Sequence, residues 1–148
     1  MKWVWIVLGA LVGVIAVVMV IGAMQPVKHV ATRRARLRAS PEAVWKVMSP
    51  GTSHTHFKQD DVNYDVLESA PPTRLITRIA DKLPYGGMWT YDLTPDGSGS
   101  ALRITENGEV YNPIFRFVSR FVMGHTATID ASLRDLGKKL GEEVKIED

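Results

Sequence analysis

Residues 101–140 read ALRITENGEVYNPIFRFVSRFVMGHTATIDASLRDLGKKL, and this stretch decides the fold because a strand passes directly into a long helix there. Ala101 to Tyr111 is expected to be the last strand of a sheet, with a bulge near Asn107-Gly108. Asn112 and Pro113 then supply an N-cap and a proline at the first helical position. A stripe at spacings of four and three predicts one helix of roughly 30 residues: Ile114, Val118, Val122, His125, Ile129, Leu133, Leu136 and Leu140.

Towards the N-terminus, the pattern changes to short strands separated by turns. The segments predicted as strands are Met88–Thr94, Arg74–Ala80, Val62–Val66 and His54–Lys58. Pro95-Asp96-Gly97 begins the hairpin loop before the last strand, and Ala70-Pro71-Pro72 marks another turn. These strands are therefore expected to form an antiparallel meander.

A further strand and a short helix come before the meander. His29 to Ala39 alternates between an apolar face and a charged face, as a half-buried strand does. Ser40 and Pro41 then begin a helix as its N-cap and first residue, and this helix ends at Ser49. The element order predicts an α+β fold with helices on one face of a sheet of about six strands.

The N-terminal segment differs in composition from the rest of the chain. Residues 3–24 contain no charged side chain and are mostly aliphatic. At about 1.5 Å of rise per residue, a helix of this length reaches roughly 33 Å and can cross a hydrocarbon core of about 30 Å. The sequence therefore predicts a transmembrane anchor over residues 1–25 and a folded domain over residues 26–148.

A cleaved signal peptide is the alternative for this segment. Its apolar core would span about 7–15 residues and end in an A-x-A-like site. The run here is longer, and Ile21-Gly22-Ala23 is a poor cleavage site, so a retained anchor is favoured. Basic residues from Lys28 to Arg38 follow the span, and the positive-inside rule then predicts a single-pass protein of the cell membrane with its C-terminal domain in the cytoplasm.

The composition excludes several classes of function. The chain carries 18 basic and 16 acidic residues, a formal net charge of +2, which argues against a nucleic-acid partner. The absence of cysteine excludes disulfides, thiolate metal sites and cysteine nucleophiles. Gly9 and Gly13 form a G-x-x-x-G pattern that is common by chance in such a run, so no oligomeric state is predicted.

Three motifs carry a family resemblance, in this order along the chain: Ala39–Trp45, Gly86–Leu93 and Ile104–Phe117. With them, the chain from about residue 29 to 141 resembles the START-like SRPBCC superfamily, and more narrowly its polyketide cyclase/dehydrase and lipid-transport group. The resemblance implies a helix-grip fold, in which a curved antiparallel sheet wraps a long C-terminal helix around an apolar cavity. Residues 49–61 stand where the family has a second small helix and an extra strand, which predicts about six strands in place of seven and less cover over the cavity mouth.

The resemblance and the leader together predict a membrane-anchored domain that binds a small hydrophobic molecule or lipid between the sheet and the C-terminal helix. The residues expected to line that cavity are Trp89, Tyr91, Ile104, Tyr111, Val118, Val122, His125 and Ile129. No catalytic residue, cofactor or metal is predicted. Two alternatives stay open: a cyclase or dehydratase that uses His125 or Tyr111 as acid–base, and a protein-interaction module that encloses no ligand.

Other polar residues carry weaker functional signals. Glu106 and Glu109 could act together in general acid–base catalysis, but the sequence favours exposure of both side chains at the surface at least as strongly. Arg33 interrupts the apolar face of the first strand and could bind a ligand carboxylate or phosphate, although a solvated or lipid-facing position is favoured. His54 and His56 would share one face of a strand, but no third ligand is fixed by spacing, so no metal site is predicted.

Overall fold

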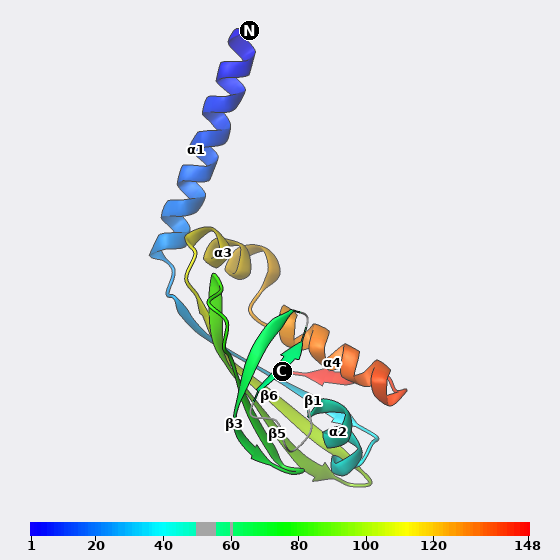
Figure 1. Ribbon diagram of the computed structural model, residues 1–148. Coiled ribbons are helices and arrows are strands. Elements are labelled where there is room, and N and C mark those ends of the chain that lie inside the picture. The colour runs from blue at the N-terminus through cyan, green and yellow to red at the C-terminus, as the bar shows by residue number, and fades with distance from the viewer. Residues whose placement is uncertain (50–55, 60) are drawn as a thin grey trace.

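The computed structural model describes residues 1–49, 56–59 and 61–148, and it shows a long N-terminal helix that projects from a folded α+β domain (Figure 1). In chain order the elements are α1 (Lys2–Met24), β1 (Lys28–Leu37), α2 (Pro41–Met48), β2 (His56–Gln59), β3 (Val62–Ala70), β4 (Arg74–Ile79), β5 (Tyr85–Asp96), β6 (Gly99–Val110), α3 (Pro113–Val118), the π-helical turn η1 (Ser119–Met123), α4 (Ala127–Leu140) and β7 (Lys145–Glu147).

The strands form one antiparallel sheet in the order β2-β3-β4-β5-β6-β1-β7. Consecutive hairpins join β2 through β6, as the meander pattern predicted, and β1 pairs with the free side of β6. The prediction of about six strands is wrong by one, because β7 pairs with Arg34–Arg36 of β1 as a seventh strand. A strand of three residues is too short for an alternating pattern to show in the sequence.

The bulge predicted near Asn107-Gly108 is also not there. Strand β6 keeps a continuous register with both β5 and β1 through these two residues, and the irregular pairing lies instead in β3, between Val66 and Glu68. Gly108 has a packing role: a Cβ at this position would clash with the ring of His29 on β1. The missing side chain therefore makes room for the histidine.

The single C-terminal helix predicted from the apolar stripe is broken into two parts. Helix α3 continues into the π-helical turn η1, and the chain then leaves helical geometry at Gly124, whose φ is +79°. Glycine adopts positive φ at little cost, so the hydrogen-bond ladder can end there and begin again at Ala127. The second part keeps the stripe in the core, whereas Val122 in the first part is 71% exposed.

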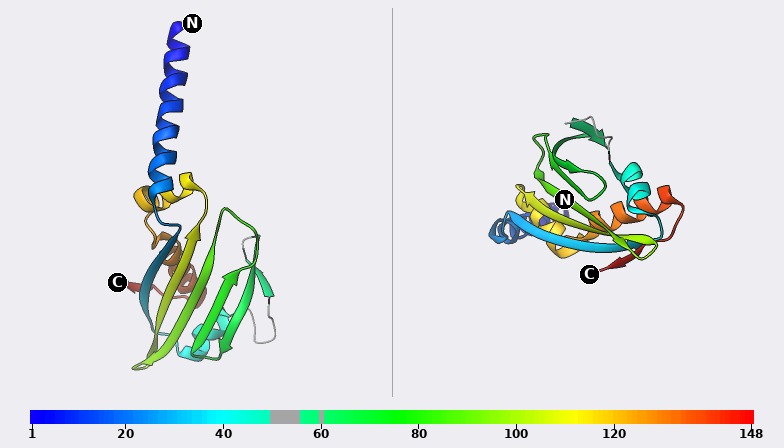
Figure 2. Two further views of the ribbon diagram at one scale, coloured as in Figure 1. Left: turned by 90° about the vertical axis from the view of Figure 1, so that its left-hand side faces the viewer. Right: turned by 90° about the horizontal axis from the view of Figure 1, so that it is seen from below.

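Both α2 and α4 lie on the concave face of the sheet (Figure 2). Ser40 caps α2 by accepting a hydrogen bond from the Ala43 N–H at 3.4 Å, and Pro41 occupies the first turn, as the sequence predicted. The buried core joins these helices to the four strands β1, β4, β5 and β6, and its members are Ala31, Ala35, Leu37, Val44, Trp45, Leu75, Leu93, Leu102, Ile104, Ile129, Leu133 and Leu136.

The C-terminal end of α1 is fixed to α3. Gly22 lies so close to Pro113 that a Cβ would overlap its carbonyl group. The guanidinium of Arg116 donates a hydrogen bond to the carbonyl oxygen of Gln25 at 2.8 Å. The remainder of α1 is exposed along its length, and the helix is long and apolar enough to cross a membrane. The last turn of α1 is therefore packed as part of the folded domain.

Candidate functional site

The concave face of the sheet, which we call the inner face, carries the polar groups closest to α4. Arg33 of β1 donates a hydrogen bond to Asp130 of α4 at 3.0 Å, and the Thr128 hydroxyl donates one to Glu106 of β6 at 3.4 Å. In cross-strand register, Glu106 lies between Ala31 of β1 and Trp89 of β5. These contacts place Arg33, Glu106 and Trp89 in one layer beneath the helix.

Glu106 is a carboxyl group held in a poorly solvated position. Its side chain is 15% exposed, and the indole of Trp89 and the hydroxyl of Thr128 both donate hydrogen bonds to it. Burial raises the pKa of Glu106 above its usual range, against the opposing effect of these two donors. The His29 Nε2 lies 3.7 Å from a carboxylate oxygen. Glu106 therefore has the environment of a group that can hold a proton or anchor the polar end of a ligand.

Two histidines stack beside this carboxyl group. The rings of His29 and His125 lie 4.2 Å apart between centroids, at an interplanar angle of 20°. Burial and the neighbouring His125 lower the pKa of His29, while burial and Arg120 lower that of His125. The Nδ1 of His125 is buried and has no hydrogen-bond partner among the residues that the structure describes. Both rings are therefore neutral near pH 7, and the buried Nδ1 of His125 can form a hydrogen bond with a ligand.

Aromatic side chains extend the inner face from β5 towards β2. Trp89 and Tyr91 lie 6.0 Å apart, and Phe57 stacks on Tyr64 at 5.0 Å. Tyr91 is hydrogen-bonded to the Thr77 hydroxyl, and burial raises the pKa of its phenol. The result is an apolar surface with a few fixed polar groups, which is the usual character of a small-molecule site.

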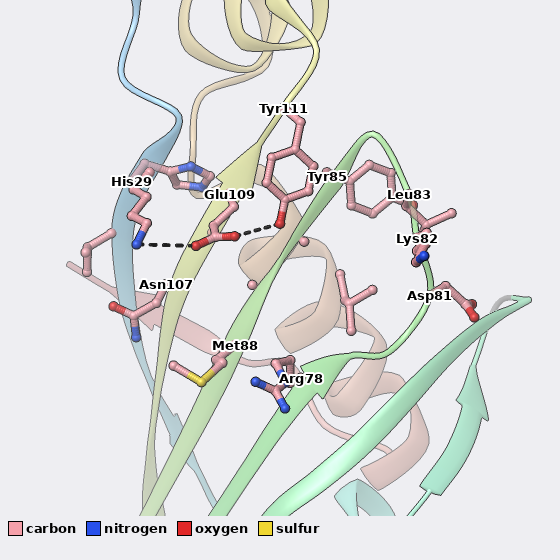
Figure 3. A pocket seen from close by; sticks show the side chains of 16 residues that line it. His29, Arg78, Asp81, Lys82, Leu83, Tyr85, Met88, Asn107, Glu109 and Tyr111 are labelled. Atoms are coloured by element: carbon pink, nitrogen blue, oxygen red, sulfur yellow. Dashed lines mark hydrogen bonds and ion pairs between the residues drawn. The ribbon is translucent and has the colours of Figure 1, made fainter.

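A larger hollow, the outer pocket, has a volume of about 760 Å³ and lies mainly on the opposite face of the sheet (Figure 3). Met88 and Asn107 contribute to it from paired positions on β5 and β6, and the β4–β5 connection forms its rim. At its upper end the Tyr111 hydroxyl donates a hydrogen bond to Glu109 at 2.6 Å, and Lys28 lies 3.6 Å from the same carboxylate. These polar pairs are satisfied among themselves and occupy that end of the pocket.

A second hollow, the junction pocket, has a volume of about 250 Å³ and lies where α1, β1 and α3 meet. Its polar lining is basic or neutral and consists of Gln25, Lys28, His29, Arg116, Ser119, Arg120 and His125. No acidic residue is among the residues that line it in the described part of the chain. The pocket is therefore suited to an anion.

The predicted cavity residues are distributed over several of these places. Ile104 and Ile129 are fully buried in the core, and Trp89 and Tyr91 pack beside them on the inner face. His125 lines the junction pocket, and Tyr111, 50% exposed, lines the outer pocket. The other two lie on the first part of the broken helix: Val118 is half-buried and Val122 is exposed.

The weaker candidates are also separated. Glu106 faces inward and Glu109 outward, so the two carboxylates do not form a pair. Arg33 is paired with Asp130 and Asp148. His56 binds Asp65 at 2.6 Å, and His54 lies outside the described residues. Among the residues that the structure describes, no group of three metal-ligating side chains occurs.

Three basic residues of the junction pocket, together with His29, were not singled out by sequence reasoning. Arg116 and Arg120 lie four positions apart and off the apolar stripe, which made them ordinary surface residues in the predicted long helix. Lys28 appeared only in the count of charges that follow the apolar segment. His29 belonged to the first predicted strand, and its partner Gly108 was assigned to a bulge. The contact between the His29 ring and Gly108 could have been expected only from the pairing of these two residues on neighbouring strands.

No family model and no curated protein sequence matches this chain. Its fold is nevertheless that of several solved structures, including CalU16 from Micromonospora echinospora, at 16% identity and a TM-score of 0.59 over 76% of this chain and 74% of that one. A conserved protein from Geobacillus kaustophilus matches at 17% identity and a TM-score of 0.57, over 80% of this chain and 100% of its own. Norcoclaurine synthase from Thalictrum flavum matches at 13% identity and a TM-score of 0.54, over 84% of this chain and 92% of that enzyme. The helix-grip architecture that the resemblance implied is confirmed, and at these identities the likeness concerns the fold alone.

Proposed function

We propose that this protein is a membrane-anchored helix-grip domain that binds a small hydrophobic molecule or lipid between its sheet and α4. The observation that carries the proposal is the exposed apolar helix α1, whose end is packed against the domain beside the inner face. An apolar ligand that leaves a bilayer would then travel only a short distance through water, where its exposure costs free energy.

The packing at Gly22 supports an anchor that is retained. A signal peptide is removed from the mature protein, so its residues have no reason to fit the folded domain. Here Gly22 fits against Pro113 without space for a side chain, and Arg116 binds the carbonyl of Gln25. Lys28, Arg116 and Arg120 lie at this end of the span, and the positive-inside rule then favours a cytoplasmic domain.

The inner face supports an apolar ligand with one polar end. Trp89 and Tyr91 provide aromatic surface, and Glu106 and His29 provide polar groups at its edge. Helix α4 packs over the β1 side of the sheet, where Arg33 binds Asp130, so the stacked pair Phe57–Tyr64 lies towards the other side. A ligand on this surface would bury aromatic area that the helix leaves uncovered.

The ligand proposal is tested on the full chain, extracted in mild detergent and analysed by mass spectrometry for co-purified lipids. We expect a bound apolar molecule that is lost in Trp89→Ala, on the inner face, and kept in Met88→Ala, its neighbour on the outer face. Absence of any bound molecule from the wild-type chain, or equal loss in both variants, would contradict a site on the inner face.

Membrane anchoring is tested separately by alkaline carbonate extraction of cells that express the full chain. We expect the protein to stay in the membrane pellet, because an apolar helix of this length inserts stably. Protease added to spheroplasts should leave the C-terminal domain intact if that domain is cytoplasmic. Release of a shortened chain that begins after Met24 would instead identify a cleaved leader.

A second candidate function is acid–base catalysis on a carbonyl compound, as in a cyclase or dehydratase. The observation that favours it is the sequence of contacts from Glu106 to His29 to His125. Tyr111 lies on the outer face, away from this group. Loss of proton exchange on a 1,3-dicarbonyl probe in His125→Ala, with retention in Tyr111→Phe, would support an enzyme, whereas no exchange by the wild-type chain would exclude this chemistry for that probe.

A further inference from the structure

We infer that the junction pocket binds a phosphate group, and that the anionic headgroup of a membrane lipid supplies it. This inference names a ligand class for the membrane-proximal end of the domain and rests on the proposed membrane anchor. The pocket exists only in the folded chain, because its residues come from different elements and their connections. The polar residues that the inference uses are Gln25, Lys28, Arg116, Ser119, Arg120 and His125.

The pocket contains two buried nitrogen atoms without hydrogen-bond partners in the described part of the chain. The Nε of Arg116, which is a donor, and the Nδ1 of His125 are both buried, and neither has a hydrogen-bond partner among the described residues, although buried polar atoms are usually paired. The other end of the Arg116 guanidinium is fixed by its hydrogen bond to Gln25. This contact orients the side chain before a ligand arrives, which lowers the entropic cost of binding.

Among the described residues, no carboxylate neutralises the charges of the two arginines in the pocket. Neither Arg116 nor Arg120 forms an ion pair within the described residues, and the carboxylates that contact other residues of the pocket, Glu109 and Glu106, have partners of their own. Glu109 binds Lys28 and Tyr111 in the outer pocket, and Glu106 lies beside His29 on the inner face. Arginine offers phosphate several N–H donors in a planar array, which makes phosphate a better match than a simple halide.

Size and position favour a headgroup over a whole lipid or a free metabolite. At about 250 Å³ the pocket is below the usual range of about 300–1,000 Å³ for a drug-sized ligand, but a phosphate ester fits. It lies at Gln25 and Pro26, directly after the apolar span, where headgroups are found if α1 crosses the bilayer. Phe121, Val122 and Met123 are exposed beside it on η1, and they suit the same interface.

The test uses the full chain in nanodiscs of phosphatidylcholine with or without phosphatidylglycerol, and native mass spectrometry counts the lipids that stay bound after release from the disc. We expect selective retention of phosphatidylglycerol that falls about tenfold in the double variant Arg116→Gln/Arg120→Gln, equivalent to about 1.4 kcal/mol. The matched control is Arg103→Gln, an exposed arginine on the outer face of β6 that removes the same kind of charge.

Inorganic phosphate, titrated into phosphatidylcholine nanodiscs, distinguishes the source of the phosphate. Saturable phosphate binding without phosphatidylglycerol selectivity would keep the phosphate site and overturn the lipid headgroup as its ligand. Equal phosphatidylglycerol retention in wild type, double variant and Arg103→Gln, together with no phosphate binding, would overturn the site itself. Carbonate extraction reports on the anchor independently, so failure of the proposed function and failure of this pocket give different results.

Discussion

The two parts of the C-terminal helical segment share one apolar stripe and have different partners. On α4, Ile129 and Leu133 are fully buried against the sheet and α2. On α3 and η1, Ile114 and Val122 are exposed, and α3 packs against the end of α1. The comparison shows that an apolar stripe indicates which face of a helix can be buried. Which element packs against that face depends on where the chain turns.

The prediction with the largest expected effect compares the truncation of a stripe residue in α4 with the truncation of a stripe residue in η1. Leu133→Ala in α4 should lower the free energy of unfolding by about 2–5 kcal/mol, because it leaves a cavity in a fully buried site. Val122→Ala in η1 should change it by less than about 0.5 kcal/mol. Urea unfolding of the full chain in detergent, followed by tryptophan fluorescence, measures both. Similar losses in the two variants would mean that η1 is packed in the folded protein.

A second test concerns the contact between α1 and α3. Gly22→Ala should displace α3 because the new methyl group meets the carbonyl of Pro113, at a cost of about 1–3 kcal/mol. Gly13→Ala, on the same helix with open space around it, is the matched control. Hydrogen–deuterium exchange should become faster in residues 113–123 for Gly22→Ala and remain unchanged for Gly13→Ala. Unchanged exchange in both variants would show that α3 does not depend on α1.

A third test concerns Gly124, the residue at which the two parts of the C-terminal helical segment are separated. Gly124→Ala places a side chain at a φ of +79° and a ψ of 150°, a region that is essentially restricted to glycine and costs other residues about 1–3 kcal/mol. The strain should be relieved by local rearrangement between η1 and α4, which circular dichroism and a lower unfolding midpoint would detect. Gly141→Ala, which is also at positive φ but follows α4, should lower the midpoint without changing exchange in η1.

The smallest expected effect is on pH dependence at the histidine pair. Because the folded-state pKa values of His29 and His125 are lowered, the unfolded chain binds protons more readily, and the free energy of unfolding should fall as pH drops below about 6.5. Glu106 acts in the opposite direction, since its raised pKa favours the folded state at lower pH. Lys28, Arg116 and Arg120 line the same pocket as the two histidines.

Unfolding midpoints at pH 7.5 and 5.5 measure this effect. The double variant His29→Gln/His125→Gln should lose the histidine part of the slope, while His56→Gln, which removes a histidine from the distant edge strand, should keep it. A slope that is unchanged in the double variant would assign the pH dependence to other groups.

Local signals predicted much of the fold. Ser40 and Pro41 marked the start of α2, and Pro95 to Gly97 marked the β5–β6 hairpin, because caps and turns depend on residues a few positions apart. Strand β7 was missed because three residues carry too little periodicity. The break at Gly124 was missed because a single glycine also occurs within helical patterns.

The candidate site was less predictable than the fold. Glu106 and His125 were recognised as residues that could carry chemistry, but their link through His29 was not. Residue 29 lies on β1, residue 106 on β6 and residue 125 in the connection between η1 and α4. The junction pocket likewise combines Gln25 with Arg116 and Arg120, across about 90 positions of sequence. Nothing in a local pattern specifies which distant side chains share a pocket.

The sequence by itself determined an apolar helix long enough to span a bilayer, a meander of strands and the stripe that buries α4. These follow from the order of apolar and polar residues, because burial of apolar area acts on each face of an element. Only the tertiary structure decided that α3 packs on α1 and that His29 stacks on His125. It also decided that Arg116 and Arg120 line one pocket that has no acidic residue among its described lining. Those contacts depend on the exact path of the chain through Gly124 and on the curvature of the sheet, which local periodicity does not encode.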